Sequence, residues 1–189
     1  EKQANDIKLE IEIPVEAPQG LSSIRLHTPQ GTTETRNFYI GPLPEVVEQE
    51  DNLDHPGERI SQLNSSWVGT IQAAGDVDFW MFEAKSGEEI VFEVQGKNFG
   101  SNLESKLTVL DAQGAILAVS QRPLGGRPAW TGFQAKAAGK YVLKVEDRNF
   151  SGSGGHFYLI HAGSFPYITE SFPLGISSLD QESSLQING

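Results

Sequence analysis

The sequence predicts an all-β protein built around an antiparallel, jelly-roll-like β-sandwich. Three observations lead to this fold class. From Trp67 onward, β-rich segments recur at short intervals, and many of the 20 glycines and 10 prolines lie in the turns between them. No window repeats its apolar residues at helical spacing. Eight such segments in about a hundred residues are enough for two packed sheets.

We expect eight strands in the central part of the chain. Their ranges are 67–72, 77–84, 89–95, 106–111, 115–119, 129–134, 140–147 and 156–162. In three of them every second side chain is apolar, which is the period of a strand with one buried face. The nine residues that this alternation assigns to the core are Trp80, Phe82, Ala84, Ile90, Phe92, Val94, Tyr141, Leu143 and Val145.

Further short strands are expected at 7–13, 21–28 and 36–40. In the first of them, apolar residues alternate with charged ones, which predicts a half-buried strand. Three short strands are too few to close a sandwich alone. The acidic stretch 41–58, which contains prolines and little periodicity, is interpreted as a linker or an ordered loop.

The composition excludes several classes of function. With 14 basic against 25 acidic residues, the net charge is -11, and such a surface repels nucleic acids and anionic membranes. No apolar run is long enough for membrane insertion. The absence of cysteine excludes disulfides, thiolate metal sites and cysteine nucleophiles.

The sequence offers no pattern that is typical of an enzyme. His156 and His161 lie five residues apart in one expected strand, so their side chains would point to opposite faces. Neither an HExxH motif nor a G-x-S-x-G nucleophile turn occurs. We therefore expect a protein without catalytic activity.

Three segments in a fixed order carry a family resemblance. They are the acidic EQEDN at 48–52, GTIQAAGDVDFWMFEAKSGEEIVFEV at 69–94, and AAGKYVLKVED at 137–147. Together they make about residues 45–162 resemble the bacterial pre-peptidase C-terminal domain. Modules of that family are β-sandwiches appended to secreted peptidases and other large exported proteins, and none is a catalyst. The resemblance implies a secreted or cell-envelope location.

The two flanks resemble a different sandwich, the IPT/TIG immunoglobulin-like domain. The expected organisation is therefore 1–43, the last strands of one such domain; 44–164, the central sandwich; and 165–189, the start of another. Because the chain opens with a polar segment and no signal peptide, we expect it to be a piece of a longer protein. Flanking strands of neighbouring copies could also pair and produce dimers.

Calcium is the cofactor that the resemblance implies. Some relatives among the collagen-binding domains of clostridial collagenases bind it with an acidic linker folded against a D-x-D segment. The matching positions here are Glu48, Glu50, Asn52, Asp76 and Asp78. Their side chains supply the hard oxygen ligands that calcium takes. Alternatively, the linker is only solvated, and Gly75-Asp76 is a turn in which Asp serves turn chemistry.

The loop 121–130 is a candidate ligand-binding site. Arg122, Arg127 and Trp130 combine positive charge with an aromatic surface on an otherwise acidic chain. A long hairpin without a ligand is the alternative. We expect a binding or spacer module whose partners are an extracellular protein or polysaccharide, or neighbouring domains of the same chain. A purely structural spacer and a targeting module of a secreted hydrolase are the alternatives.

Overall fold

The computed structural model of the chain describes residues 9–49, 59–120, 128–175 and 183–189. In these residues the regular structure is β, apart from the short 3-10 helix η1 (Lys97–Phe99). The chain divides into two compact units, 1–42 and 43–189. The predicted division into three domains stays a prediction, as does the likeness of the flanks to immunoglobulin-like domains.

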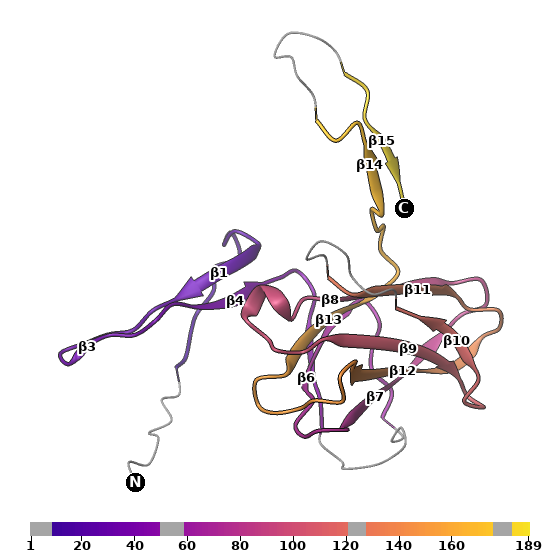
Figure 1. Cartoon of the computed structure of the whole chain (residues 1–189). Coiled ribbons are helices and arrows are strands. Elements are labelled where there is room, and N and C mark those ends of the chain that lie inside the picture. The colour runs from indigo at the N-terminus through magenta and orange to yellow at the C-terminus, as the bar shows by residue number, and fades with distance from the viewer. Residues whose placement is uncertain (1–8, 50–58, 121–127, 176–182) are drawn as a thin grey trace. The chain divides into compact units, whose positions relative to one another are not determined.

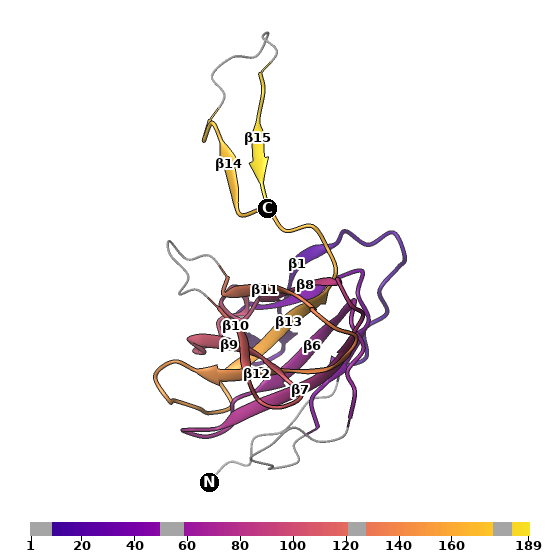
Figure 2. The ribbon, with the colours of Figure 1, turned by 90° about the vertical axis from the view of Figure 1, so that its right-hand side faces the viewer.

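Two sheets form the sandwich of the second unit (Figure 1 and Figure 2). The four-stranded sheet has the order β10 (Ile116–Val119), β9 (Ser105–Asp111), β12 (Gly139–Asp147), β7 (Val77–Ala84). The five-stranded sheet has the order β11 (Trp130–Gln134), β8 (Glu89–Val94), β13 (Phe157–Gly163), β6 (Ser65–Thr70), β5 (Glu45–Val47). Neighbouring strands are antiparallel except β5, which runs parallel to β6.

The predicted fold class and the eight central strands are confirmed. The strand predicted at 77–84 is β7 residue for residue, and the others differ from the observed bounds by one or two residues. All nine predicted core residues are buried. Alternation identified them correctly because both sheets have one face turned to the shared core.

Aromatic rings fill the centre of that core. Trp67 of one sheet stacks on Trp80 of the other, with ring centroids 5.1 Å apart and planes 11° from parallel. Phe82 and Phe92 meet edge to face at 5.2 Å. These contacts join the two sheets, so the core depends on residues from both.

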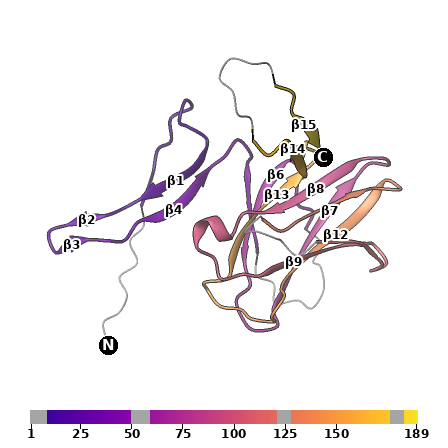
Figure 3. The ribbon, with the colours of Figure 1, turned by 45° about the horizontal axis from the view of Figure 1, so that its top comes forward.

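The first unit is a long ribbon, which Figure 3 shows. Its antiparallel strands are β1 (Gly20–Ile24) and β4 (Arg36–Ile40), extended by β2 (His27–Thr28) and β3 (Gly31–Thr32). The strand predicted at 7–13 is wrong for residues 9–13, which form no strand and are exposed. The alternation is present, but no described strand of this unit pairs with the segment, and pairing is what makes a strand.

The ends of the second unit also carry short strands. β14 (Glu170–Phe172) and β15 (Gln186–Asn188) form a two-stranded antiparallel sheet.

The stretch 41–58 was expected to be a linker or loop, and its residues 45–47 instead form β5 at the edge of the five-stranded sheet. A segment with this few residues shows no measurable period, so the sequence did not reveal it.

Candidate functional site

Glu48 is the first acidic residue of the predicted calcium set, and β5 brings it to the sandwich. It follows the last residue of β5 and continues the parallel pairing, since its backbone N–H donates to the Val68 carbonyl at 2.8 Å. Its side-chain Oε2 accepts a hydrogen bond from the backbone N–H of Thr70 at 3.1 Å. The acidic linker is thus fastened to the edge of β6 at this point.

A glycine opens the space into which the Glu48 carboxylate reaches. A Cβ on Gly69 would lie 2.3 Å from Glu48 Oε2 and 2.4 Å from the Tyr158 hydroxyl oxygen. Gly69 and Tyr158 are direct partners across β6 and β13. Both oxygens therefore crowd the position that any larger residue would fill, and they lie within a few ångströms of each other.

Tyr158 connects this point to the opposite sheet. Its hydroxyl donates to Asp78 Oδ2 at 2.6 Å and accepts from Trp80 Nε1 at 2.9 Å. Asp78 is 4% exposed and Tyr158 is 1% exposed. Burial first, and then the charges of Asp78 and Glu48, raise the pKa of Tyr158 well above its usual value. The hydroxyl therefore stays protonated and remains a donor to the carboxylate.

The structure thus brings the carboxylates of Glu48 and Asp78 close to the same residue, Tyr158.

Asp76 has a different environment. Its Oδ2 accepts from the Gln72 backbone N–H at 2.7 Å and its Oδ1 from its neighbour Val77 at 2.9 Å. Gly75 precedes it with φ of 82°. These bonds are what the turn interpretation describes, and a role of Asp76 toward calcium stays a prediction.

The remaining predicted site residues are only partly described. Glu50, Asn52, Arg122 and Arg127 lie outside the described residues. In the part of the chain that is described, no group of three or more histidine, aspartate or glutamate side chains is placed to hold a metal ion. Of the five predicted positions, Glu48, Asp76 and Asp78 are described, and Glu48 and Asp78 are the two that approach Tyr158.

Trp130, predicted as a ligand contact, is half-buried at the start of β11. Its ring packs on Tyr167, with centroids 4.6 Å apart and planes at 34°. One part of the expected aromatic surface is thus covered by the same chain. Sequence reasoning missed Tyr167 because it lies in the C-terminal flank, far from Trp130 in sequence.

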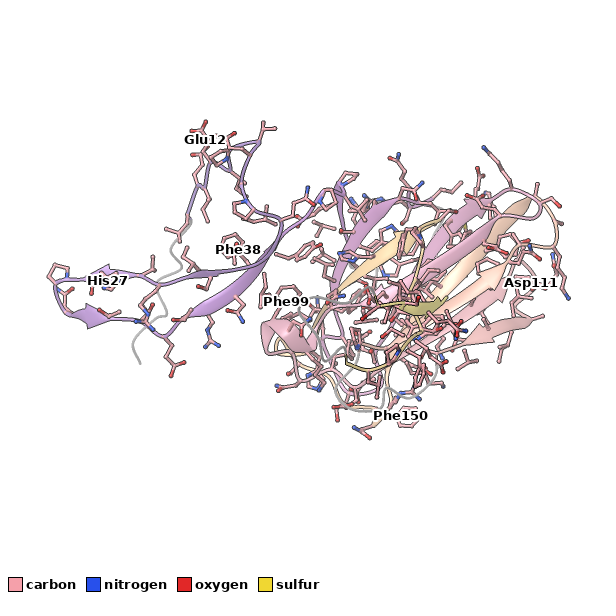
Figure 4. The ribbon with its side chains drawn as sticks, turned by 90° about the horizontal axis from the view of Figure 1, so that it is seen from above. Glu12, His27, Phe38, Phe99, Asp111 and Phe150 are labelled. Atoms are coloured by element: carbon pink, nitrogen blue, oxygen red, sulfur yellow. The ribbon has the colours of Figure 1, made fainter. Side chains whose placement is uncertain are left out.

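The described histidines have separate partners. His27 lies on the ribbon of the first unit, with Nδ1 2.9 Å from Thr32 Oγ1 (Figure 4). His156 Nδ1 lies 2.8 Å from Ser153 Oγ. His161 Nδ1 is 3.7 Å from a carboxylate oxygen of Glu93.

Gly69 and Tyr158 are the site residues that the sequence prediction did not include. One signal was present, because a glycine inside an expected strand often marks a close approach of another group. Nothing local names that group, since Glu48 and Tyr158 belong to distant parts of the sequence.

Comparison with known proteins adds a structural similarity. No family model matches the chain, and no curated protein matches it. A similar solved structure is the 1.0 Å crystal structure of the pre-peptidase C-terminal domain of a collagenase from Bacillus anthracis. It is 18% identical, covers 63% of this chain and 92% of that chain, and has a TM-score of 0.41. The described residues contain no helix long and apolar enough to span a membrane.

Proposed function

We propose that the chain is a non-catalytic β-sandwich module of a larger secreted or cell-envelope protein, and that calcium fastens its acidic linker to the sandwich. The observation that carries this proposal is the meeting of Glu48, from the linker side, with the buried Tyr158–Asp78 pair. Its partners would be neighbouring domains of the same chain, or an extracellular protein or polysaccharide contacted through residues 121–130.

The chemistry of the donor set suits a hard cation. Two carboxylate groups approach the Tyr158 hydroxyl, Asp78 from a buried position and Glu48 from a half-buried one. The Tyr158 hydroxyl and the Thr70 N–H each occupy one oxygen of one carboxylate. Calcium takes six to eight oxygen ligands, so Glu48 and Asp78 would be part of a larger set. Glu50 and Asn52 are the residues that we propose to complete it.

The environments of two further acidic groups support a non-catalytic role. Asp147 is buried, and its carboxylate accepts backbone N–H bonds from Glu104, Asn149 and Ser151. The carboxylate of Glu146 is held between the side chains of two lysines. Both carboxylates thus bind groups of the chain itself, Asp147 in a turn and Glu146 on a sheet face, whereas a catalytic carboxylate is directed at a substrate.

A calcium-dependent melting experiment tests the proposal. The melting temperature of the sandwich is measured in EDTA, in millimolar calcium and in millimolar magnesium. Calcium at a hundredfold excess over its dissociation constant would stabilise the folded state by about 2.7 kcal/mol. Glu48→Gln should abolish this increment. Glu45→Gln is the matched control, because Glu45 is an exposed acidic residue of β5, the strand directly before Glu48.

The outcomes separate the alternatives. A rise that is specific to calcium, and absent from Glu48→Gln, supports the proposed site. An unchanged melting temperature in the unmodified protein would leave a spacer without a cation. An equal rise in both variants would assign the effect to calcium bound elsewhere on the acidic surface.

A further inference from the structure

A row of one aromatic and two ionisable side chains crosses the outer face of the five-stranded sheet. Trp130 of β11 is the direct partner of Glu93 of β8, and Glu93 is the direct partner of His161 of β13. Direct partners project from the same face of a sheet. Ile160 and Phe92, on the other parity, are in the core. The row therefore points away from the core.

This row is nevertheless sheltered from solvent. The side chains of His161 and Glu93 are only 14% and 19% exposed. Tyr167 lies against the row, because its ring packs on Trp130 at 4.6 Å. The pKa of Glu93 is lowered, first by the neighbouring His161 ring, whose Nδ1 lies 3.7 Å from the carboxylate; burial opposes this effect, and Gln95 and Tyr167 add to it. Tyr167 thus covers this end of the row with its aromatic ring.

The chain turns back to reach this position. β13 ends at Gly163, where a Cβ would lie 2.4 Å from Asn64 Oδ1. The next residue, Ser164, donates its backbone N–H to that same Asn64 oxygen at 3.2 Å. Its hydroxyl donates to Glu88 Oε1, also at 3.2 Å. The segment that leaves β13 is therefore bonded to the sandwich before Tyr167 is reached.

We infer that the row of Trp130, Glu93 and His161 is a docking surface for the chain's own C-terminal segment, and that Tyr167 seated on it fixes the direction of strands β14 and β15. Ser164 alone would leave the following residues free to rotate. Tyr167 adds a second attachment several residues later, and two separated attachments define a direction. We call this contact of Tyr167 with Trp130, Glu93 and His161 the joint. It uses none of the residues of the proposed cation site.

The surface serves as an internal interface between the sandwich and the strands that follow. An aromatic pair beside a half-buried carboxylate and histidine has the composition of an interface contact. A spacer needs such a contact if it is to hold its neighbours at a fixed angle, because short unsupported connections permit domain motion.

Distance measurement between two spin labels tests the joint. The chain has no cysteine, so Lys140→Cys on β12 and Ser171→Cys on β14, both at exposed positions, can be labelled selectively. The unmodified joint should give one narrow distance distribution. Tyr167→Ala and Trp130→Ala should each lose the narrow peak. Tyr167→Phe keeps the ring and removes only the hydroxyl group, so it should broaden the distribution less.

Two controls make the result decisive. Phe172→Ala removes an aromatic side chain that is 70% exposed in the same segment, and it should leave the distribution narrow. Near-ultraviolet circular dichroism of the stacked Trp67–Trp80 pair verifies that each variant retains the sandwich. A broad distribution in the unmodified joint would overturn the inference. A narrow distribution retained in Tyr167→Ala would also overturn it, and calcium should change neither result.

Discussion

Replacing Gly69 by alanine tests whether the approach of Glu48 and Tyr158 holds the linker to the sandwich. The new Cβ would lie 2.3 Å from Glu48 Oε2 and within 2.6 Å of two Tyr158 atoms. Neither side chain can withdraw without weakening a bond, to Thr70 in one case and to Asp78 in the other. Overpacking in a core costs about 1–3 kcal/mol, and a lost hydrogen bond about 0.5–1.5 kcal/mol.

The expected destabilisation is therefore about 2–4 kcal/mol in the free energy of unfolding, measured by urea denaturation. At roughly 3–4 °C per kcal/mol for a unit of this size, the melting temperature falls by about 6–16 °C. Gly132→Ala is the matched control in β11 of the same sheet, where the added Cβ would meet its nearest atom at 3.5 Å. Its effect should stay within about 0.5 kcal/mol.

A double variant identifies the cause. Adding Glu48→Ala to Gly69→Ala removes the atom at 2.3 Å, so the combined loss should be smaller than the sum of the single losses. If Gly69→Ala is as stable as Gly132→Ala, or if the two changes simply add, the proposed contact between linker and core is refuted.

The other predictions concern the same polar groups. Tyr158→Phe removes the donor to Asp78 and the acceptor for Trp80, which should cost about 1–3 kcal/mol of stability by urea denaturation. Burial opposes ionisation of Asp147, but backbone N–H bonds from Glu104, Ser151 and Asn149 lower its pKa below 3.8. The stabilisation of the folded state by this carboxylate is therefore fully present above pH 3.8, the pKa of the unfolded chain. It is lost as the pH falls through the lower pKa of Asp147 in the folded state. Asp147→Asn should therefore reduce the fall of the melting temperature at acid pH. An unchanged fall would contradict the assignment of this effect to Asp147.

The alternation of side chains made the sandwich predictable. In β7 and β8 each buried residue is separated from the next by a less buried one, and this period is a local property of the sequence. In β12 the apolar residues Tyr141, Leu143 and Val145 follow the same period, although Val142 is buried as well. Turn residues between these segments marked their ends. The same logic proposed a strand over 7–13 and was wrong for residues 9–13, because alternation does not provide a pairing partner.

The candidate site was predictable only in part. The resemblance selected Glu48 and Asp78, and the structure brings both to Tyr158. It also selected Asp76, whose two oxygens accept backbone N–H bonds of its own turn. A spacing of two residues places two carboxylates on one side of an extended segment, yet it does not decide which of them a local N–H will occupy.

The sequence by itself determined the fold class, the central strands and nine residues of the core, because these depend on local period and turn chemistry. Only the tertiary structure decided that Glu48 and Tyr158 meet across Gly69, and that Tyr167 returns to Trp130 and Glu93. Tyr158 and Asp78 are 80 residues apart in sequence. Such contacts are set by the order in which strands pair, and the pairing free energy depends on the whole packed core rather than on any one segment.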